Sequence, residues 1–296
     1  MMDLSIIIIT MNRAAQLCEA IQSCLKCNLP EGTEFVIIDN ASSDNTEDTV
    51  HQLMNETNHK IIYKKLPENL GVGGGRNFAL KYVTGNYIYV LDDDAVIDDV
   101  DKDFFLKAIA ILEKNPNYAT LTTQIYDTAW KDNRLKHTDL KVADNIYECF
   151  MPCGGSHFFR RSDFVDPVYY PNKYGYEEIA VAMQAYKNGR INVFCSDLRI
   201  IHKPKINKWV VKDNKQHFIN DFASQYAIKK VLYPKCVLPL LWTAYKARYF
   251  RYLHGSQLSA QGTEIINGLV NIGSGFNRID ISTFIHLVRK FGFSIL

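Results

Sequence analysis

The stretch that most constrains the fold is an apolar run that ends in three carboxylates, from Tyr87 to Asp94. Residues 87–91 lack polar alternation, which is typical of a strand buried on both faces. Asp92, Asp93 and Asp94 then lie at its carboxyl end, where open α/β sheets bind ligands. Adjacent carboxylates repel each other and raise each other's pKa, and a hard divalent cation relieves that cost. The stretch predicts a metal–diphosphate site; the alternative is an acidic turn that merely ends a strand.

Other predicted strands follow the same plan, with helices between them. Residues 4–9 and 34–39 are apolar runs, and the second ends in Asp39. Helical spacing over residues 17–25 separates them, and a short third strand is expected over residues 61–63. This alternation predicts right-handed βαβ units and a mainly parallel sheet flanked by helices. Asp39 and the three aspartates should therefore lie along one edge of the sheet.

A glycine-rich loop, residues 69–77, should open near the same edge. Its backbone N–H groups could approach a phosphate closely. The loop is no dinucleotide-binding fingerprint, because the sixth position counted from Gly71 is Arg76. No G-x-x-x-x-G-K-[ST] motif occurs, which argues against a P-loop nucleotide hydrolase.

The second half of the chain adds more polar groups. Gly154 and Gly155 precede a strand, and glycines there permit close approach of a ligand or of another backbone. Glu177 and Glu178 begin a helix, either as site residues or because acids favour helix N-termini. A strand or strand pair over residues 191–201 leads to His202.

Two segments are less specific. Residues 130–144 are polar and predict a loop, which either faces substrate or is a solvated insertion. After Pro204 strand signals stop and helical segments follow. Among them, residues 233–254 form a basic, aromatic amphipathic stretch, which either docks on the protein core or lies on a membrane surface.

Length and composition limit the class of protein. The 296 residues suit one large domain with a helical appendage, and a net charge of +2 gives no case for nucleic acid as a partner. Seven cysteines without a framework spacing, and a start without a signal-peptide pattern, predict a cytoplasmic chain with reduced thiols. No apolar run approaches the roughly 20 residues of a spanning helix, so membrane contact, if any, would be peripheral. Oligomeric state is not readable from these patterns.

Taken in order, these motifs resemble those of the family 2 glycosyltransferases, which have the GT-A fold. The resemblance covers about residues 3–203 and rests on residues 5–13, 36–44, 69–71 with Arg76 and Asn77, Asp92 to Asp94, 175–178 with Gly189, and His202. It implies a catalytic domain over residues 1–204 and a helical C-terminal region over residues 205–296. Within the domain, residues 1–100 would bind the nucleotide-sugar, and residues 101–204 would carry the acceptor and catalytic half.

The resemblance also implies roles for single residues. Thr10 and Asp39 would hold the base, Arg76 would contact the nucleotide, and Asp92 would lie near the ribose. Asp94 would bind a divalent metal, Mn²⁺ or Mg²⁺, and His202 would assist it. Glu178 would be the general base, with Glu177 as the fallback. The remaining residues predicted to bind the nucleotide-sugar are Asn12, Arg13, Asn69, Gly71, Asp93 and Gly155.

The implied reaction is transfer of a hexosyl or deoxyhexosyl group, with inversion, from a nucleoside-diphosphate sugar. A UDP-sugar is favoured, and the acceptor would be a saccharide, a lipid-linked molecule or a protein in surface polysaccharide or glycoconjugate synthesis. Met11 stands where the family often has an aromatic residue, Glu178 replaces an aspartate, and Ala180 and Gln184 replace an acid and an arginine. The alternatives are a non-catalytic nucleotide-sugar-binding subunit and a nucleotidyltransferase.

Overall fold

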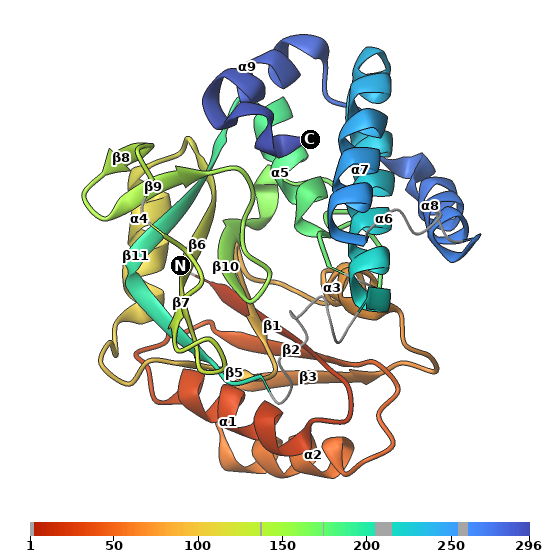
Figure 1. Ribbon diagram of the computed structural model, residues 1–296. Helices are drawn as coiled ribbons and strands as arrows, with labels where there is room; N and C mark the ends of the chain where they lie inside the picture. Colours follow the sequence, from red (N-terminus) through yellow and green to blue (C-terminus); the bar gives the residue numbers. More distant parts are fainter. Residues whose placement is uncertain (1–2, 137, 174, 205–214, 254–259) are drawn as a thin grey trace.

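The computed structural model describes residues 3–136, 138–173, 175–204, 215–253 and 260–296, and its centre is one mixed β-sheet (Figure 1). The strand order is β3-β2-β1-β4-β10-β6-β11-β9-β8, with β5 paired to β11 and β7 to β6. Strands β1 to β4 are parallel, β10 is antiparallel to both its neighbours, and β6 is parallel to β11. The predicted mainly parallel sheet flanked by helices is confirmed.

The strands are β1 (Leu4–Thr10), β2 (Glu34–Asp39), β3 (Lys60–Lys65), β4 (Tyr87–Asp92), β5 (Ala95–Ile97), β6 (Tyr118–Asp127), β7 (Asp132–Asn133), β8 (Lys141–Ala143), β9 (Ile146–Cys149), β10 (Ser156–Arg160) and β11 (Ile191–His202). The helices are α1 (Ala14–Leu25), α2 (Thr46–Glu56), α3 (Gly71–Ala79), α4 (Phe104–Lys114), α5 (Glu178–Lys187), α6 (Lys215–Leu232), α7 (Leu238–Leu253), α8 (Ala260–Ile272) and α9 (Ile281–Phe291).

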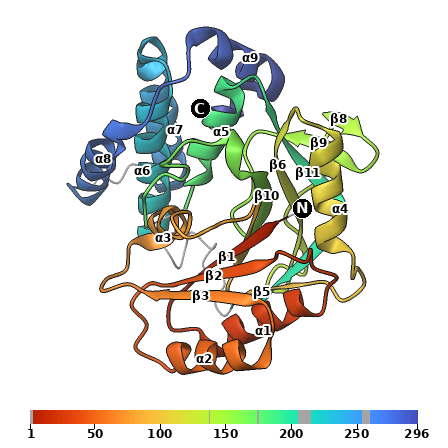
Figure 2. The same cartoon turned by 180° about the vertical axis from the view of Figure 1, so that it is seen from behind.

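Alternate residues of β1 face two different sets of helices. Ile6 and Ile8 join an apolar cluster with α1, α2 and α4, whereas Ile7 joins a second cluster with residues of α3 and α5. Because side chains alternate along a strand, a continuous run of isoleucines serves both faces at once. Figure 2 shows α1 and α2 below strands β1 to β3, with α3 on the other side. The central strands are thus buried on both faces, as the sequence predicted.

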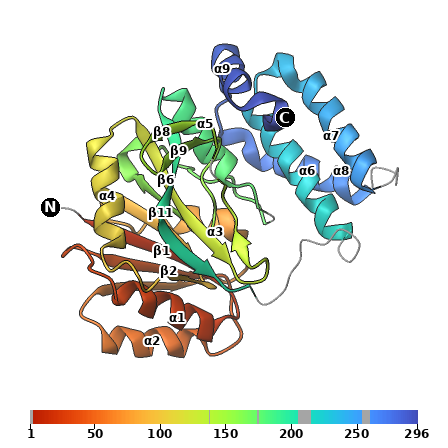
Figure 3. The same ribbon diagram turned by 60° about the vertical axis from the view of Figure 1, so that its left-hand side comes forward.

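The C-terminal helices pack on the sheet domain through α5. Ile179 and Met183 of α5 belong to a third apolar cluster with α6, α7, α8 and α9, while Val181 faces the sheet. Figure 3 shows α6 to α9 gathered beside the sheet domain rather than against the strands. Among the described residues, no helix has the length and apolar character needed to cross a bilayer.

Two predictions about segments need correction or completion. The polar segment 130–144 is not a plain loop, because it holds β7 and β8, which pair with β6 and β9. These strands are only two and three residues long, which is too short for a pattern of alternating apolar residues to predict them. Of the amphipathic stretch 233–254, Leu241, Tyr245 and Tyr249 are buried, so this helix docks on the protein core. Two parts of the predicted C-terminal region lie outside the described residues, namely 205–214 and 254–259, and the second includes the last residue of the amphipathic stretch.

Candidate active site

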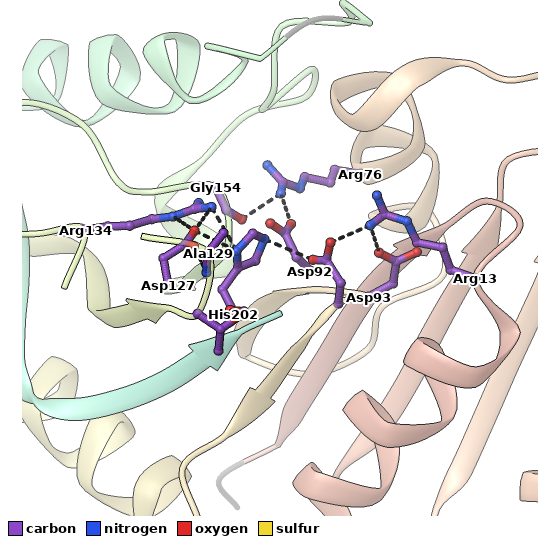
Figure 4. Close-up of polar contacts among 11 residues, drawn as sticks. Arg13, Arg76, Asp92, Asp93, Asp127, Ala129, Arg134, Gly154 and His202 are labelled. Carbon is purple, nitrogen blue, oxygen red and sulfur yellow. Dashed lines mark hydrogen bonds and ion pairs between the residues drawn. The ribbon is translucent and has the colours of Figure 1, made fainter. Parts of the chain in front are cut away.

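Strand register brings the predicted acidic strand ends together. In the parallel pairs, Thr10 lies beside Asp39, and Ile9 lies beside Asp92. His202, the last residue of β11, approaches the same edge from the other half of the sheet, as Figure 4 shows. The edge expected from the sequence therefore exists, and it joins residues separated by more than a hundred positions.

Asp92, Asp94 and His202 form a cluster that could hold a metal ion. One potential ligand atom from each lies within 4.8 Å of the others. His202 Nε2 is 3.1 Å from Asp94 Oδ1, and both side chains are buried. Burial alone would raise the pKa of Asp94, but its hydrogen bond to His202 and the charges of His202 and Arg13 hold that pKa below its usual value. Burial would lower the pKa of His202, but Asp94 and Asp92 raise it overall.

Asp93 differs from its neighbours because its side chain turns toward β1. It accepts hydrogen bonds from Thr10 Oγ1 at 2.8 Å and from Arg13 Nη1 at 2.8 Å. The same Arg13 nitrogen lies 2.7 Å from Asp94 Oδ2. Burial raises the pKa of Asp93 to about 6. The pKa of Asp93 is thus raised mainly by burial, to which the charge of Asp94 adds. The predicted rise is wrong for Asp94, because His202 and Arg13 outweigh the effect of burial there.

Arg76 connects Asp92, a member of the possible metal-binding cluster, to Glu177 and Glu178. Its guanidinium donates to Glu178 Oε1 at 2.6 Å, to Glu177 Oε1 at 2.9 Å and to Asp92 Oδ1 at 3.2 Å. It also donates to the Gly154 carbonyl at 2.7 Å and lies 5.3 Å from the ring centre of Tyr169. Arg76 is only 2% exposed. A buried guanidinium in this setting is held by carboxylates, which it matches in charge.

The two glutamates have different environments. Burial and the charge of Glu178 raise the pKa of Glu177 to about 8. Glu177 Oε2 is buried and lacks a hydrogen-bond partner. Burial and the neighbouring carboxylate thus favour the protonated form of Glu177. The pair is more than a helix-terminal preference, because Arg76 reaches it from a helix about a hundred residues earlier.

Gly154 and Gly155 leave room for carboxylates of the chain itself. A Cβ on Gly154 would lie 2.3 Å from Glu178 Oε1, and one on Gly155 would lie 3.1 Å from Asp92 Oδ2. At these glycines the atoms that approach closely are carboxylate oxygens of Glu178 and Asp92, rather than another backbone.

Asp39, predicted to hold the base, and Asn12, predicted to bind the nucleotide-sugar, support a network of loops. Asp39 is fully buried; it accepts from Tyr63 Oη at 2.6 Å and from the Ser42 backbone N–H at 2.7 Å. Asn12 has a positive φ of 54° and accepts from the Ser43 N–H at 2.8 Å. These bonds fix the turns after β1 and β2 beside each other.

The glycine loop is fixed against a later segment. Gly71 has a φ of 74°, and a Cβ there would lie 2.6 Å from the Asn172 carbonyl oxygen. Its N–H donates to Asn69 Oδ1 at 2.7 Å, and Asn40 Nδ2 donates to its carbonyl at 3.2 Å. Asn69 Nδ2 reaches Met11 Sδ at 3.1 Å, so the loop borders the turn after β1.

The substitutions that suggested a non-catalytic protein serve packing. Ala180 is fully buried among the C-terminal helices. Gln184 accepts from the Val165 N–H and donates to the Pro167 carbonyl, at 3.1 Å and 3.0 Å. Their contacts belong to the packing around α5, and the non-catalytic alternative stays open.

Sequence reasoning missed Asp127 and Arg134. Asp127 Oδ2 lies 3.0 Å from His202 Nδ1 and accepts from Arg134 Nη2 at 2.7 Å. Asp127 ends β6 just as Asp92 ends β4, so the rule of acids at strand ends could have found it. Arg134 follows β7 and had no local signal. Tyr63, which binds Asp39, was seen only as a strand residue.

Known proteins resemble the chain in sequence. The family described as "Glycosyl transferase family 2" matches residues 5–166. The poly-beta-1,6-N-acetyl-D-glucosamine synthase of Staphylococcus epidermidis is 30% identical over 119 residues, or 40% of this chain and 27% of that protein. The poly(ribitol-phosphate) beta-N-acetylglucosaminyltransferase TarS of Staphylococcus aureus (strain Mu50) is 32% identical over 118 residues, or 39% of this chain and 20% of that protein. The match thus spans about a quarter or less of these curated relatives.

Solved structures resemble almost the whole chain in fold. TarS 1–349 of S. aureus in complex with UDP-GlcNAc has a TM-score of 0.62 at 17% identity, covering 99% of this chain and 89% of that one. The mannosyltransferase PcManGT of Pyrobaculum calidifontis in complex with GDP-Man and Mn²⁺ has a TM-score of 0.59 at 17% identity, covering 99% and 80%. At such identities the likeness concerns the fold.

Proposed function

The chain belongs to glycosyl transferase family 2, and we propose that it moves a hexosyl or deoxyhexosyl group from a nucleoside-diphosphate sugar to an acceptor hydroxyl with inversion. It has the GT-A fold. The observation that carries the proposal is the pairing of a three-ligand acidic cluster with two buried glutamates through Arg76. Membership of this family removes the nucleotidyltransferase alternative.

We propose Asp92, Asp94 and His202 as the residues that hold a divalent metal, Mn²⁺ or Mg²⁺. Two carboxylates and an imidazole within 4.8 Å suit such an ion, and carboxylate oxygen is the ligand that hard cations prefer. When bound, the metal would supply Lewis-acid stabilisation of charge on the diphosphate leaving group. Arg13, beside Asp93 and Asp94, offsets part of the acidic charge.

We assign the general base to Glu178, with Glu177 as the neutral partner. The base must take the proton of the acceptor hydroxyl as the bond to the donor breaks. Arg76 fixes Glu178 through a 2.6 Å hydrogen bond, and the pKa of about 8 keeps Glu177 protonated at neutral pH. One base and no covalent intermediate would give inversion at the anomeric carbon.

For the donor we favour a UDP-sugar. The names of the relatives concern N-acetylglucosamine transfer, and TarS 1–349 is known in complex with UDP-GlcNAc. The proposed donor site comprises Thr10, Asn12, Arg13, Asp39, Asn69, Gly71, Arg76, Asp92, Asp93 and Gly155. Residues 1–100 would supply most of it, and residues 101–204 would supply the catalytic half.

The acceptor we propose is a saccharide, lipid-linked or protein substrate in surface polysaccharide or glycoconjugate synthesis. A peripheral membrane contact fits α7, where Leu240, Lys246 and Phe250 are exposed. Helix α7 contains no acidic residue, which suits an anionic lipid surface.

Thermal unfolding with UDP-, GDP-, dTDP- and CMP-sugars, each with and without Mn²⁺, tests the donor site. A ligand at about 100 times its Kd stabilises by roughly 2.7 kcal/mol, on the order of 5–10 °C in Tm for this chain length. We expect such a shift with a UDP-sugar only when Mn²⁺ is present, and its loss in Asp94→Asn. The absence of a shift with every donor would refute a working donor site and favour the non-catalytic alternative.

A further inference from the structure

His202 lies between two carboxylates. Its Nε2 faces Asp94 Oδ1 at 3.1 Å. Its Nδ1 faces Asp127 Oδ2 at 3.0 Å, and Figure 4 shows His202 beside Asp127. Arg134 Nη2 also lies 2.9 Å from the same Nδ1, so a carboxylate and a guanidinium both hold this ring nitrogen. These two contacts at Nδ1 fix the rotation of the ring and direct Nε2 toward Asp92 and Asp94.

Asp127 is itself held by bonds to the β6–β7 hairpin. It is 1% exposed, and its Oδ1 accepts from the backbone N–H groups of Ala129 and Trp130 at 2.9 and 3.1 Å. Arg134 donates to Oδ2 through Nε at 3.0 Å and Nη2 at 2.7 Å. The carboxylate has donors on both oxygens, so it cannot turn toward the metal cluster without losing several bonds.

Arg134 compensates the buried charge of Asp127 and is fixed in turn. Its guanidinium lies 5.3 Å from the ring centre of Trp130, and its backbone N–H donates to the Ile125 carbonyl at 2.8 Å. The hairpin is also tied to the end of β11, because the Thr128 N–H donates to the His202 carbonyl at 3.0 Å. Backbone and side chain of His202 are therefore positioned by the same hairpin.

We propose that Asp127 and Arg134 are positioning residues, which orient His202 as a ligand and thereby set the affinity of the site for its divalent cation. This inference rests on the proposed metal site. It extends the site beyond residues that touch the ion to the β6–β7 hairpin. Loss of such a supporting partner typically weakens metal binding by about 10–100-fold.

The test is binding of Mn²⁺ alone, measured by the electron paramagnetic resonance signal of the free ion and by calorimetry, without donor or turnover. Asp127→Asn keeps the shape but removes the charge, and we expect Kd for Mn²⁺ to rise about 10–100-fold. Arg134→Lys keeps the charge but not the two-nitrogen contact, and we expect a smaller rise of about 3–10-fold. Tm of each variant checks that the fold is retained.

Asp132→Asn is the matched control. Asp132 lies on the same hairpin, is exposed and bonds to Lys136 at 2.6 Å, without contact to His202. Its variant should bind Mn²⁺ like the wild type. A general weakening of the hairpin would instead affect both aspartate variants.

A double-mutant cycle separates positioning from a merely structural role. In a His202→Ala background, Asp127→Asn should cost at most about twofold, because the ligand that it orients is gone. Wild-type affinity in Asp127→Asn, or an undiminished loss in the His202→Ala background, would overturn the inference and leave the metal site intact. If the wild type bound no Mn²⁺ at millimolar concentration, the proposed metal site itself would be wrong.

Discussion

Replacement of Glu178 by Gln tests the assignment of the base most directly. The change keeps the shape and the oxygen that accepts from Arg76 but removes the ability to take a proton. A positioned general base contributes about 10²–10⁴-fold, so turnover should fall by that factor, or about 2.7–5.4 kcal/mol of transition-state stabilisation. Donor affinity should stay within about twofold, because Glu178 would act on the acceptor.

The structure also indicates how the fold tolerates this change. Arg76 is one cation among three carboxyl groups, those of Asp92, Glu177 and Glu178. Burial and the charge of Glu178 hold the pKa of Glu177 near 8. Without that charge, the pKa of Glu177 should fall, and Glu177 would become an ionised partner of Arg76. We therefore expect a stability loss of about 1 kcal/mol, which is about 2–4 °C in Tm.

Glu177→Gln is the matched comparison, since it replaces an already neutral group of nearly the same shape. It should reduce turnover by less than about tenfold at pH 7. The assay is release of nucleoside diphosphate from the donor that shifts Tm, with its acceptor or with water. A Glu178→Gln enzyme within about threefold of the wild type would refute the assignment, and a large loss in Glu177→Gln alone would move the base to Glu177.

Three further predictions concern stability, geometry and the membrane. Because the pKa of Glu177 is raised in the folded state, protonated Glu177 stabilises the fold at low pH, and this contribution is lost as pH rises through about 8. The free energy of unfolding in urea should therefore be lower at pH 8.5 than at pH 5.5, on the order of a few kcal/mol, and Glu177→Gln should remove this difference. Gly154→Ala places a Cβ 2.3 Å from Glu178 Oε1, the atom that Arg76 holds, so this carboxylate must shift. We expect turnover to fall about 10²-fold, and equal turnover would contradict the geometry. Phe250→Glu, at a residue 70% exposed on α7, should reduce co-sedimentation with anionic vesicles, whereas Val100→Glu, at a residue 85% exposed near α4, should not.

The fold was predictable where the signals are local. Apolar runs such as residues 4–9 and 34–39 are visible as buried strands because both faces of the central sheet are covered. The strands β7 and β8 were not predicted, because they are two and three residues long and form only through pairing with β6 and β9. The helical C-terminal region was evident from the end of strand signals, but its docking through α5 was not.

The candidate site was predictable as a set of residues and much less as a set of contacts. Acids at strand ends must meet at one edge of a parallel sheet, so Asp39, Asp92 and Asp94 could be grouped without knowing the structure. Which cation neutralises which acid depends on side chains from distant segments. Arg13 reaches Asp94 across 81 positions, and Arg76 reaches Glu178 across 102.

Arg76 shows why this difference matters for mechanism. Resemblance assigns it to the nucleotide, yet the folded chain uses its two Nη nitrogens on Asp92, the two glutamates and the Gly154 carbonyl. A buried guanidinium between the metal side and the base side makes the charge at one side sensitive to the other. Negative charge that develops on a leaving group beside Asp92 would then change the electrostatic environment of Glu178 through the shared Arg76 cation. Such coupling follows from three-dimensional contact alone, because no spacing along the chain ties residue 76 to residues 92, 177 and 178.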